Sequence, residues 1–280
     1  MKVSYIIPHR NRTSLLHANL ASLAAQTCKD FEVIVVDNSD AAEYDNLKYI
    51  CATAKTSGMD IKCYRIEPSL HPESHPKYQC GGAYNPALAQ NIGAKKASGE
   101  ILVLTSPEVV NANTNIENIV KVFENDESKF VLGWIDERHP HQVGALGSGI
   151  SADKIKALCA VPGNGAMCRD DVPHRPWFPE NYFLGCMWKK DFIRIGGVDE
   201  RFMRSIAYED NCFAQCCLRN GIPIQLNTSI VGLHLSHSRS YQQDLNNPNK
   251  DLWMSIKDKI NISNDGVNWG DFAYIIEEWV

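Results

Sequence analysis

Two adjacent carboxylates, Glu209 and Asp210, open a segment with helical character in the sequence YEDN. Acidic residues are common in the first turn of a helix because they interact favourably with the helix dipole. Two neighbouring carboxylates also repel each other, so that one can have a raised pKa and act as a base near neutral pH. The pair is therefore either an ordinary helix start or a catalytic pair.

A second set of polar residues follows apolar segments. Glu108 comes after the apolar run 101–105, in the turn Ser106-Pro107-Glu108, and His234 and His237 close a later apolar run. A single histidine is usually structural, whereas two near a strand end, in a chain with acidic groups elsewhere, are candidates for a metal site. Glu108 could be a metal ligand, a sugar-binding carboxylate or the start of a loop.

Asp37 ends the apolar run "FEVIVV". It could cap a turn or helix, but its position favours a carboxylate that accepts hydrogen bonds from a base or a ribose. The loop 8–12 carries Arg10 and Arg12, which could be solvated or could hold a pyrophosphate. The sequence contains neither a Gly-x-Gly-x-x-Gly motif nor a Walker loop, which disfavours a redox dinucleotide and an ATPase.

These residues need elements that bring them together. Apolar runs of strand type alternate with segments of helical spacing through the first half of the chain. The predicted strands are 3–7, 31–37, 59–67 and 100–106, and the predicted helices are 15–25, 44–54, 86–99 and 115–125. The alternation predicts an α/β fold with a mostly parallel central sheet and helices on both faces. Ligands bind beyond the carboxyl ends of such strands, so the polar segments 8–12, 37–40 and 106–108 should converge.

The second half is less regular. A strand is predicted at 129–136, helices at 152–159 and 209–220, and two short strands within 223–235. The long irregular stretch 139–179 is typical of a functional loop. The tail 241–280 ends in an amphipathic piece with aromatic residues that are hard to bury, so it is a candidate dimer contact.

Composition limits the classes of function. The 280 residues carry a formal net charge of -5 and are 44% hydrophobic, which fits an ordinary globular protein and offers no basic surface for nucleic acid. No apolar run reaches the roughly 18 residues that a membrane span needs. The ten cysteines form no paired Cys-x-x-Cys set and are interpreted as reduced thiols. With no signal peptide apparent, a cytoplasmic location is predicted.

Several segments together resemble one family. "VSYIIPHRNR", "FEVIVVDNSD", "QNIGAKKASGEILVL", "IGGVDERF" and "YEDNCFAQCCLRNG" occur in the order and spacing of the GT-A glycosyltransferases of the family 2 type, over residues 2–237. The segment around "HSR" resembles the C-terminal segment of galactosyltransferases. The resemblance implies a GT-A fold with a Rossmann-like sheet in one domain, 1–240. Its nucleotide-sugar half would be about 1–110 and its acceptor half about 111–240, and the tail 241–280 would pack on the domain or on a partner.

The resemblance also implies an activity. It is the inverting transfer of a sugar from a nucleotide-diphosphate donor, with UDP slightly favoured, to a hydroxyl group of a glycan or glycoconjugate. Asp210 would be the general base and Glu209 its acceptor-binding neighbour. The donor pocket would be lined by Pro8, Arg10, Asp37 and Asn91. At Gln90-Asn91 the family often has Arg-Asn, which puts one contact to the donor in question.

The family usually has Asp-x-Asp where this chain has Ser106-Pro107-Glu108. Only the last position keeps a carboxylate. The resemblance implies a Mn²⁺ or Mg²⁺ ion held by Glu108 and His237, with His234 as a further ligand, while Ser106 would contact the donor. Trp177 and Trp188 are candidates for acceptor binding because indole faces stack on sugar rings, although tryptophans are more often part of a core.

Two alternatives remain open. One is a nucleotide-sugar or glycan-binding protein of the same fold that has lost catalysis, which the altered Asp-x-Asp position supports. The retained Glu209-Asp210 pair argues against it, since a binding protein needs no base. The other is a transferase of the same fold that works without a metal.

Overall fold

The structure is a computed structural model that describes residues 1–66, 86–141, 150–159, 166–168, 183–205, 207–237 and 247–279. The helices are α1 (Thr13–Ala24), α2 (Ala41–Thr56), α3 (Pro86–Lys96), α4 (Asn115–Val122), α6 (Ala152–Cys159), α7 (Lys189–Arg194), α8 (Glu209–Arg219) and α9 (Pro248–Ile256), with short 3-10 helices η1 (Glu200–Arg204) and η2 (Phe272–Tyr274). The strands are β1 (Val3–His9), β2 (Phe31–Asp37), β3 (Ile61–Ile66), β4 (Ile101–Thr105), β5 (Val109–Asn111), β6 (Phe130–Arg138), β7 (Ala166–Cys168), β8 (Leu184–Trp188), β9 (Ile224–Leu235) and β10 (Ile275–Trp279).

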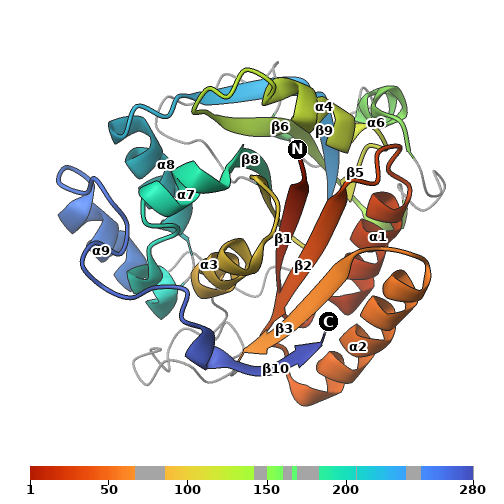
Figure 1. Ribbon diagram of the computed structural model, residues 1–280, viewed down its shortest axis with the longest axis horizontal. Coiled ribbons are helices and arrows are strands. Elements are labelled where there is room, and N and C mark those ends of the chain that lie inside the picture. The colour runs from red at the N-terminus through yellow and green to blue at the C-terminus, as the bar shows by residue number, and fades with distance from the viewer. Residues whose placement is uncertain are drawn as a thin grey trace.

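The described strands form one sheet in the order β10-β3-β2-β1-β4-β8-β6-β9-β5, with β7 paired to β6. Figure 1 shows β10, β3, β2 and β1 side by side. The four neighbours β3, β2, β1 and β4 are parallel. Beyond them β8 runs antiparallel to both β4 and β6, while β9 is parallel to β6. The predicted α/β fold is therefore confirmed, and its parallel core is built from the alternating first half of the chain.

Helices cover both faces of the parallel core (Figure 1). Side chains alternate along β1: Val3, Tyr5 and Ile7 pack in one apolar cluster with α1 and α2, whereas Ile6 packs in another with α3. This two-sided burial explains why these strands read as continuous apolar runs rather than as alternating ones. Helix α3 lies so close to the sheet that a Cβ atom on Gly93 would come within 2.5 Å of Ile6.

The segment 224–235 is one strand, β9, and the prediction of two short strands there is wrong. The register between β6 and β9 shifts between Gly133, which pairs with Asn227, and Trp134, which pairs with Val231. The three intervening residues, of which Thr228 and Ser229 are polar, bulge out of the ladder instead of ending it. A polar interruption of this kind has the same sequence pattern as a turn.

The segment 247–279 packs on the rest of the domain. The Asn264 side chain donates to the carbonyl oxygens of Gly196 and Val198, at 2.8 Å each, and accepts from the backbone N–H of Glu200 at 2.9 Å. The final amphipathic piece forms η2 and β10, and β10 pairs antiparallel with β3 at the edge of the sheet. A dimer contact through this tail stays a prediction. No described helix combines the length and apolar character that crossing a membrane requires.

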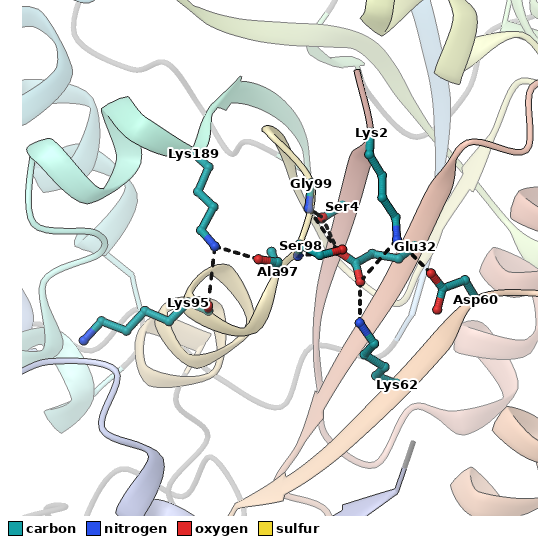
Figure 2. A network of polar contacts seen from close by, with 10 residues as sticks. All are labelled: Lys2, Ser4, Glu32, Asp60, Lys62, Lys95, Ala97, Ser98, Gly99 and Lys189. Carbon is teal, nitrogen blue, oxygen red and sulfur yellow. Dashed lines mark hydrogen bonds and ion pairs between the residues drawn. The ribbon is translucent and has the colours of Figure 1, made fainter.

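A buried carboxylate joins the amino ends of the parallel strands (Figure 2). Glu32 on β2 accepts hydrogen bonds from Ser4 Oγ at 2.6 Å, Lys62 Nζ at 2.7 Å, and both the backbone N–H and the hydroxyl of Ser98 at 2.6 and 2.8 Å. Beside it Lys189 Nζ donates to the Ala97 carbonyl oxygen at 2.6 Å, just beyond the end of α3. Glu32 therefore ties β1, β2, β3 and the turn before β4 together.

This network predicts acid-sensitive stability. Burial alone would raise the pKa of Glu32, but the hydrogen bonds from Lys62, Ser4 and Ser98 outweigh it and lower the pKa from 4.5 to about 2. A carboxyl group with a lowered pKa stabilises the fold above the unfolded-state value and loses that contribution as the pH falls to the folded value. A shift of this size corresponds to about 3 kcal/mol.

We expect Glu32→Gln to lower the free energy of unfolding at pH 7 by about 3 kcal/mol, measured by urea denaturation. The wild type should lose this advantage between pH 4.5 and about 2, so that the two proteins converge in acid. Glu124→Gln changes an exposed carboxylate and is the matched control. A constant stability gap between wild type and Glu32→Gln down to pH 2 would contradict the assignment.

Candidate functional site

The backbone brings the turn after β4 and the end of β9 together. Ser106 O accepts hydrogen bonds from Val109 N and from the Asn19 side chain on α1, which fixes the turn. Val109 pairs with His234, and the N–H of Leu235 donates to Glu108 O at 2.8 Å. Residues more than 120 positions apart in the sequence are thereby set side by side.

Three side chains converge on one oxygen of the Glu108 carboxylate. Arg12 Nη1 donates to Oε1 at 2.8 Å, and the Nε2 atoms of His234 and His237 each lie 3.4 Å from it. The side chain of Glu108 is only 3% exposed. Burial alone would raise its pKa, but the hydrogen bonds from His234 and His237 and the charge of Arg12 outweigh burial and hold the pKa well below its ordinary value. Glu108 is therefore ionised at neutral pH.

The residues around Glu108 fit a divalent cation. One ligand atom each from Glu108, His234 and His237 lie within 4.8 Å of one another. Glu108 Oε2 and Ser106 Oγ are buried and make no hydrogen bond to the residues that the structure describes, so they could accept one from a ligand or water. A set of one carboxylate and two imidazoles suits a transition metal such as Mn²⁺ better than Mg²⁺, which prefers an all-oxygen shell.

Glu137 on β6 stands behind His234 and was not predicted from the sequence. Its Oε1 lies 3.7 Å from His234 Nδ1 and accepts a hydrogen bond from Ser236 Oγ at 2.9 Å. A carboxylate behind a ligating histidine commonly fixes the orientation of the ring. The only sequence indication was its place at the end of the strand predicted at 129–136.

A second group surrounds Asp37. Its Oδ1 lies 2.7 Å from His9 Nδ1 and accepts a hydrogen bond from Ser39 Oγ at 2.5 Å. The backbone N–H of Arg12 donates to His9 Nε2 at 3.3 Å. Asp37 Oδ2 is buried and makes no hydrogen bond within the described ranges. The sequence identified Asp37 but not the roles of His9 and Ser39 in holding it.

Pro8 and Arg10 lie at the same end of β1 and β2. Pro8 is a buried residue of β1 and pairs with Val36. Arg10 is largely buried, and its Nη2 lies 3.7 Å from Oδ1 of the exposed Asp40. Both predicted donor residues are therefore placed near Asp37 by the strand register.

The structure does not bring Asn91 or Trp188 to these groups. The Asn91 amide donates to Val198 O and Glu200 Oε1, and its Oδ1 accepts from Val198 N, all at 2.8 Å. Asn91 is thus a buried tie between α3 and the segment "GGVDE". Trp188 pairs with Ile101 at the far end of β4 from Glu108, packs edge-on against Phe123, and is a core residue. Trp177 lies outside the described residues.

Glu209 and Asp210 form another group at the start of α8. The two preceding residues, Ala207 and Tyr208, have φ angles of 70° and 74°, a left-handed conformation that costs energy for residues other than glycine. Asn249 Nδ2 on α9 holds this segment by donating to the carbonyl oxygens of Phe202, Ser205 and Ala207. Nothing in the sequence pattern singled out Asn249.

The two carboxylates differ in chemistry. Burial and the neighbouring charge of Asp210 raise the pKa of Glu209 to about 8, so that Glu209 is mostly protonated at neutral pH. Asp210 Oδ1 accepts a hydrogen bond from the N–H of Asn211 at 2.8 Å. The pair can therefore offer one neutral hydrogen-bond donor and one carboxylate base.

Comparison with known sequences finds similarity to glycosyltransferases. The model of the family described as glycosyl transferase family 2 matches residues 4–68. The chain is 24% identical to an uncharacterized glycosyltransferase of Rickettsia conorii, over 72% of this chain and 32% of that protein. It is 25% identical to validoxylamine A glucosyltransferase of Streptomyces hygroscopicus, over 87% of this chain and 57% of that protein. The chain thus spans about a third to just over half of these relatives' length.

Solved structures share the fold. TarS 1-349 of S. aureus in complex with UDP-GlcNAc matches with a TM-score of 0.58 at 15% identity, over 86% of this chain and 60% of that one. A mannosyltransferase from Pyrobaculum calidifontis in complex with GDP-Man and Mn²⁺ matches with a TM-score of 0.54 at 17% identity, over 86% of this chain and 58% of that one. The match of residues 4–68 and the similarity to these relatives support a glycosyltransferase of the family 2 type, and the chain shares the fold of these structures, as predicted.

Proposed function

We propose that the protein transfers a sugar from a nucleotide-diphosphate donor to a hydroxyl group of a carbohydrate or glycoconjugate acceptor, with inversion at the anomeric carbon. The observation that carries this proposal is the position of Arg12. Its backbone N–H contacts His9 of the Asp37 group, while its side chain contacts Glu108. One residue therefore links a candidate nucleotide site to a candidate cation site, as a nucleotide-diphosphate ligand would require.

The residues divide into roles along such a donor. Asp37 Oδ2 is buried and makes no hydrogen bond in the described structure. It would accept a hydrogen bond from an N–H group of the base or from a hydroxyl group of the ribose. Arg10 would contact the phosphates, and the guanidinium group suits their geometry. Glu108, His234 and His237 would hold a divalent cation at the diphosphate. When bound, the cation would stabilise the negative charge of the leaving nucleotide.

At the acceptor, Asp210 would remove the proton of the attacking hydroxyl group. Glu209, which is mostly protonated at neutral pH, would donate a hydrogen bond to the acceptor rather than compete for its proton. The strained Ala207-Tyr208 segment that precedes the pair is consistent with a functional site, because such conformations persist only where the surroundings hold them.

The nucleotide and the metal are part of the proposal. UDP-sugars are favoured as donors, and the UDP-GlcNAc complex of TarS is compatible with that choice, whereas the archaeal mannosyltransferase contains GDP-Man. The Mn²⁺ in the latter supports a divalent cation. The ligand set of this chain, with two imidazoles, favours Mn²⁺ over Mg²⁺.

A catalytically inactive nucleotide-sugar or glycan-binding protein remains the second candidate. Ser106 stands where a carboxylate is expected, and this substitution favours reduced metal affinity. An inactive binding protein would bind a nucleotide sugar but would not cleave it into free nucleotide and sugar. The following measurements separate the two.

We expect Asp210→Asn to reduce the rate of nucleotide release from the best donor in a UDP-, GDP- and dTDP-sugar panel by about 10²–10⁴-fold, because the base is lost. Donor affinity, measured by thermal shift, should be unchanged, since Asp210 faces the acceptor in this mechanism. Asp153→Asn, in the described helix α6, is the control. Full activity in Asp210→Asn would rule out this residue as the base, and no release by the wild type on any donor and acceptor would support the inactive binder.

The raised pKa of Glu209 predicts how the free energy of unfolding changes with pH. Its pKa is raised to about 8 in the folded protein, so the folded state keeps a proton that the unfolded state loses near pH 4.5. The contribution of Glu209 to stability should therefore fall as the pH rises from 4.5 to about 8. Glu209→Gln, which cannot ionise, should match the wild type at pH 4.5 and be more stable at pH 8.5 in chemical denaturation. An equal stability gap at both pH values would contradict the raised pKa.

The cation site predicts a metal preference. Nucleotide release should stop in EDTA and recover with Mn²⁺ more fully than with Mg²⁺, because two of the three protein ligands are imidazoles. Glu108→Gln and His237→Gln should each lower Mn²⁺ affinity by at least tenfold in calorimetry, with His17→Gln on α1 as the control. Activity that is indifferent to EDTA and to Glu108→Gln would identify a transferase that works without a metal.

A further inference from the structure

The side chain of Arg12 contacts the Glu108 carboxylate, so its positive charge lies close to any cation that Glu108 binds. Its guanidinium group donates to Oε1, the same atom that faces His234 and His237. The carboxylate is buried, whereas one third of the Arg12 side chain (33%) is exposed to solvent. The Glu108 carboxylate is therefore held in place, whereas the Arg12 guanidinium is partly exposed and can change its position.

A divalent ion and the Arg12 guanidinium cannot both occupy this place without cost. An ion bound to Glu108 Oε1 would lie about 2.0–2.2 Å from that atom. The guanidinium, bonded to the same atom at 2.8 Å, would then be within roughly 5 Å of a doubly charged ion. The repulsion is only partly screened, because the Glu108 carboxylate is buried even though the Arg12 side chain is partly exposed. One of the two cations must leave, or an anion must enter between them.

We propose that Arg12 acts as an internal counter-ion that occupies Glu108 in the free protein and moves to the diphosphate when the nucleotide binds, so that nucleotide and divalent cation bind cooperatively. This inference rests on the proposed function, since it assumes a metal and a nucleotide-diphosphate ligand at this site. It adds a regulatory role for one residue of this chain: metal binding without nucleotide is suppressed.

The contacts of Arg12 allow its side chain to move while its backbone stays fixed. Its N–H donates to His9 Nε2, and its carbonyl oxygen accepts hydrogen bonds from the N–H groups of Leu15 and Leu16 at the start of α1. Only the side chain is left to change partner. A diphosphate offers the bidentate oxygen geometry that an arginine prefers, with more negative charge than one carboxylate.

Cooperativity of this kind is reciprocal. If nucleotide binding removes Arg12 from Glu108 and thereby tightens cation binding, the cation must tighten nucleotide binding by the same factor. Arg10 is a poor candidate for the same role, because its side chain is only 7% exposed and its Nη2 lies 3.7 Å from Asp40 Oδ1. The effect should therefore depend on Arg12 alone.

The test measures Mn²⁺ binding to the full chain without nucleotide, by calorimetry or by the EPR signal of free Mn²⁺. Arg12→Met and Arg12→Gln remove the charge and should bind Mn²⁺ at least tenfold more tightly than the wild type. Arg12→Lys keeps the charge and should bind Mn²⁺ as weakly as the wild type. Arg194→Met removes an arginine from another buried carboxylate, Asp191, at 2.9 Å, and should have no effect. Equal or weaker Mn²⁺ binding by both neutral Arg12 variants would overturn the proposal.

A second measurement uses UDP as the probe and corrects for Mn²⁺ bound by UDP in solution. In the wild type, saturating Mn²⁺ should lower the Kd for UDP at least tenfold, and this factor should shrink in Arg12→Met. An unchanged factor would overturn the proposal, even if the variant is less stable. Failure of the proposed function would be recognised separately, by absence of nucleotide release from every donor sugar. The comparison of Mn²⁺ affinities decides the role of Arg12 in either case.

Discussion

The burial of one charge, the Glu32 carboxylate, constrains the whole parallel core. An ionised group enclosed in a protein is stable only when its oxygens are hydrogen-bonded. The partners of Glu32 come from β1, β3 and the turn before β4. A slip of any of these strands by one residue would remove a partner and turn the apolar side chains to the wrong face. The strand register that Glu32 fixes at the amino ends therefore also fixes the positions of Asp37, Arg12 and Glu108 near the carboxyl ends.

Much of the fold could be predicted from local patterns. The β-branched runs of β1, β2 and β4 and the helical spacing between them indicate a parallel core, because strands that alternate with helices pair in parallel. In the sheet, β1, β2 and β3 are successive neighbours, and β4 pairs on the other side of β1. The second half of the chain could not be predicted in this way, because its strands pair with partners that are distant in the sequence. Strand β9 pairs in parallel with β6 from far along the chain and contains a polar bulge that imitates a turn. Such pairings depend on distant partners that no local window contains.

The candidate site was predictable where a residue is placed by a strand end and not where it is placed by a tertiary hydrogen bond. Asp37 and Glu108 follow apolar runs, and the structure places them near Arg12. The amide group of Asn91 could equally bind a ligand or hold the fold together, so the residue type does not distinguish the two roles. Its partners Val198 and Glu200 are more than 100 positions away in the sequence. Asn249 and Glu137 likewise acquire their roles only from contacts across the fold.

The pairing of β10 with β3 has a consequence for the growing chain. The edge of the parallel core is covered by a strand about 210 residues further along the sequence. During synthesis, the edge of β3 therefore lacks this partner strand until residues 275–279 have been made. An unpaired edge of this kind can recruit strands from other nascent chains. Strand β10 thus covers an edge that would otherwise offer its backbone groups to other strands.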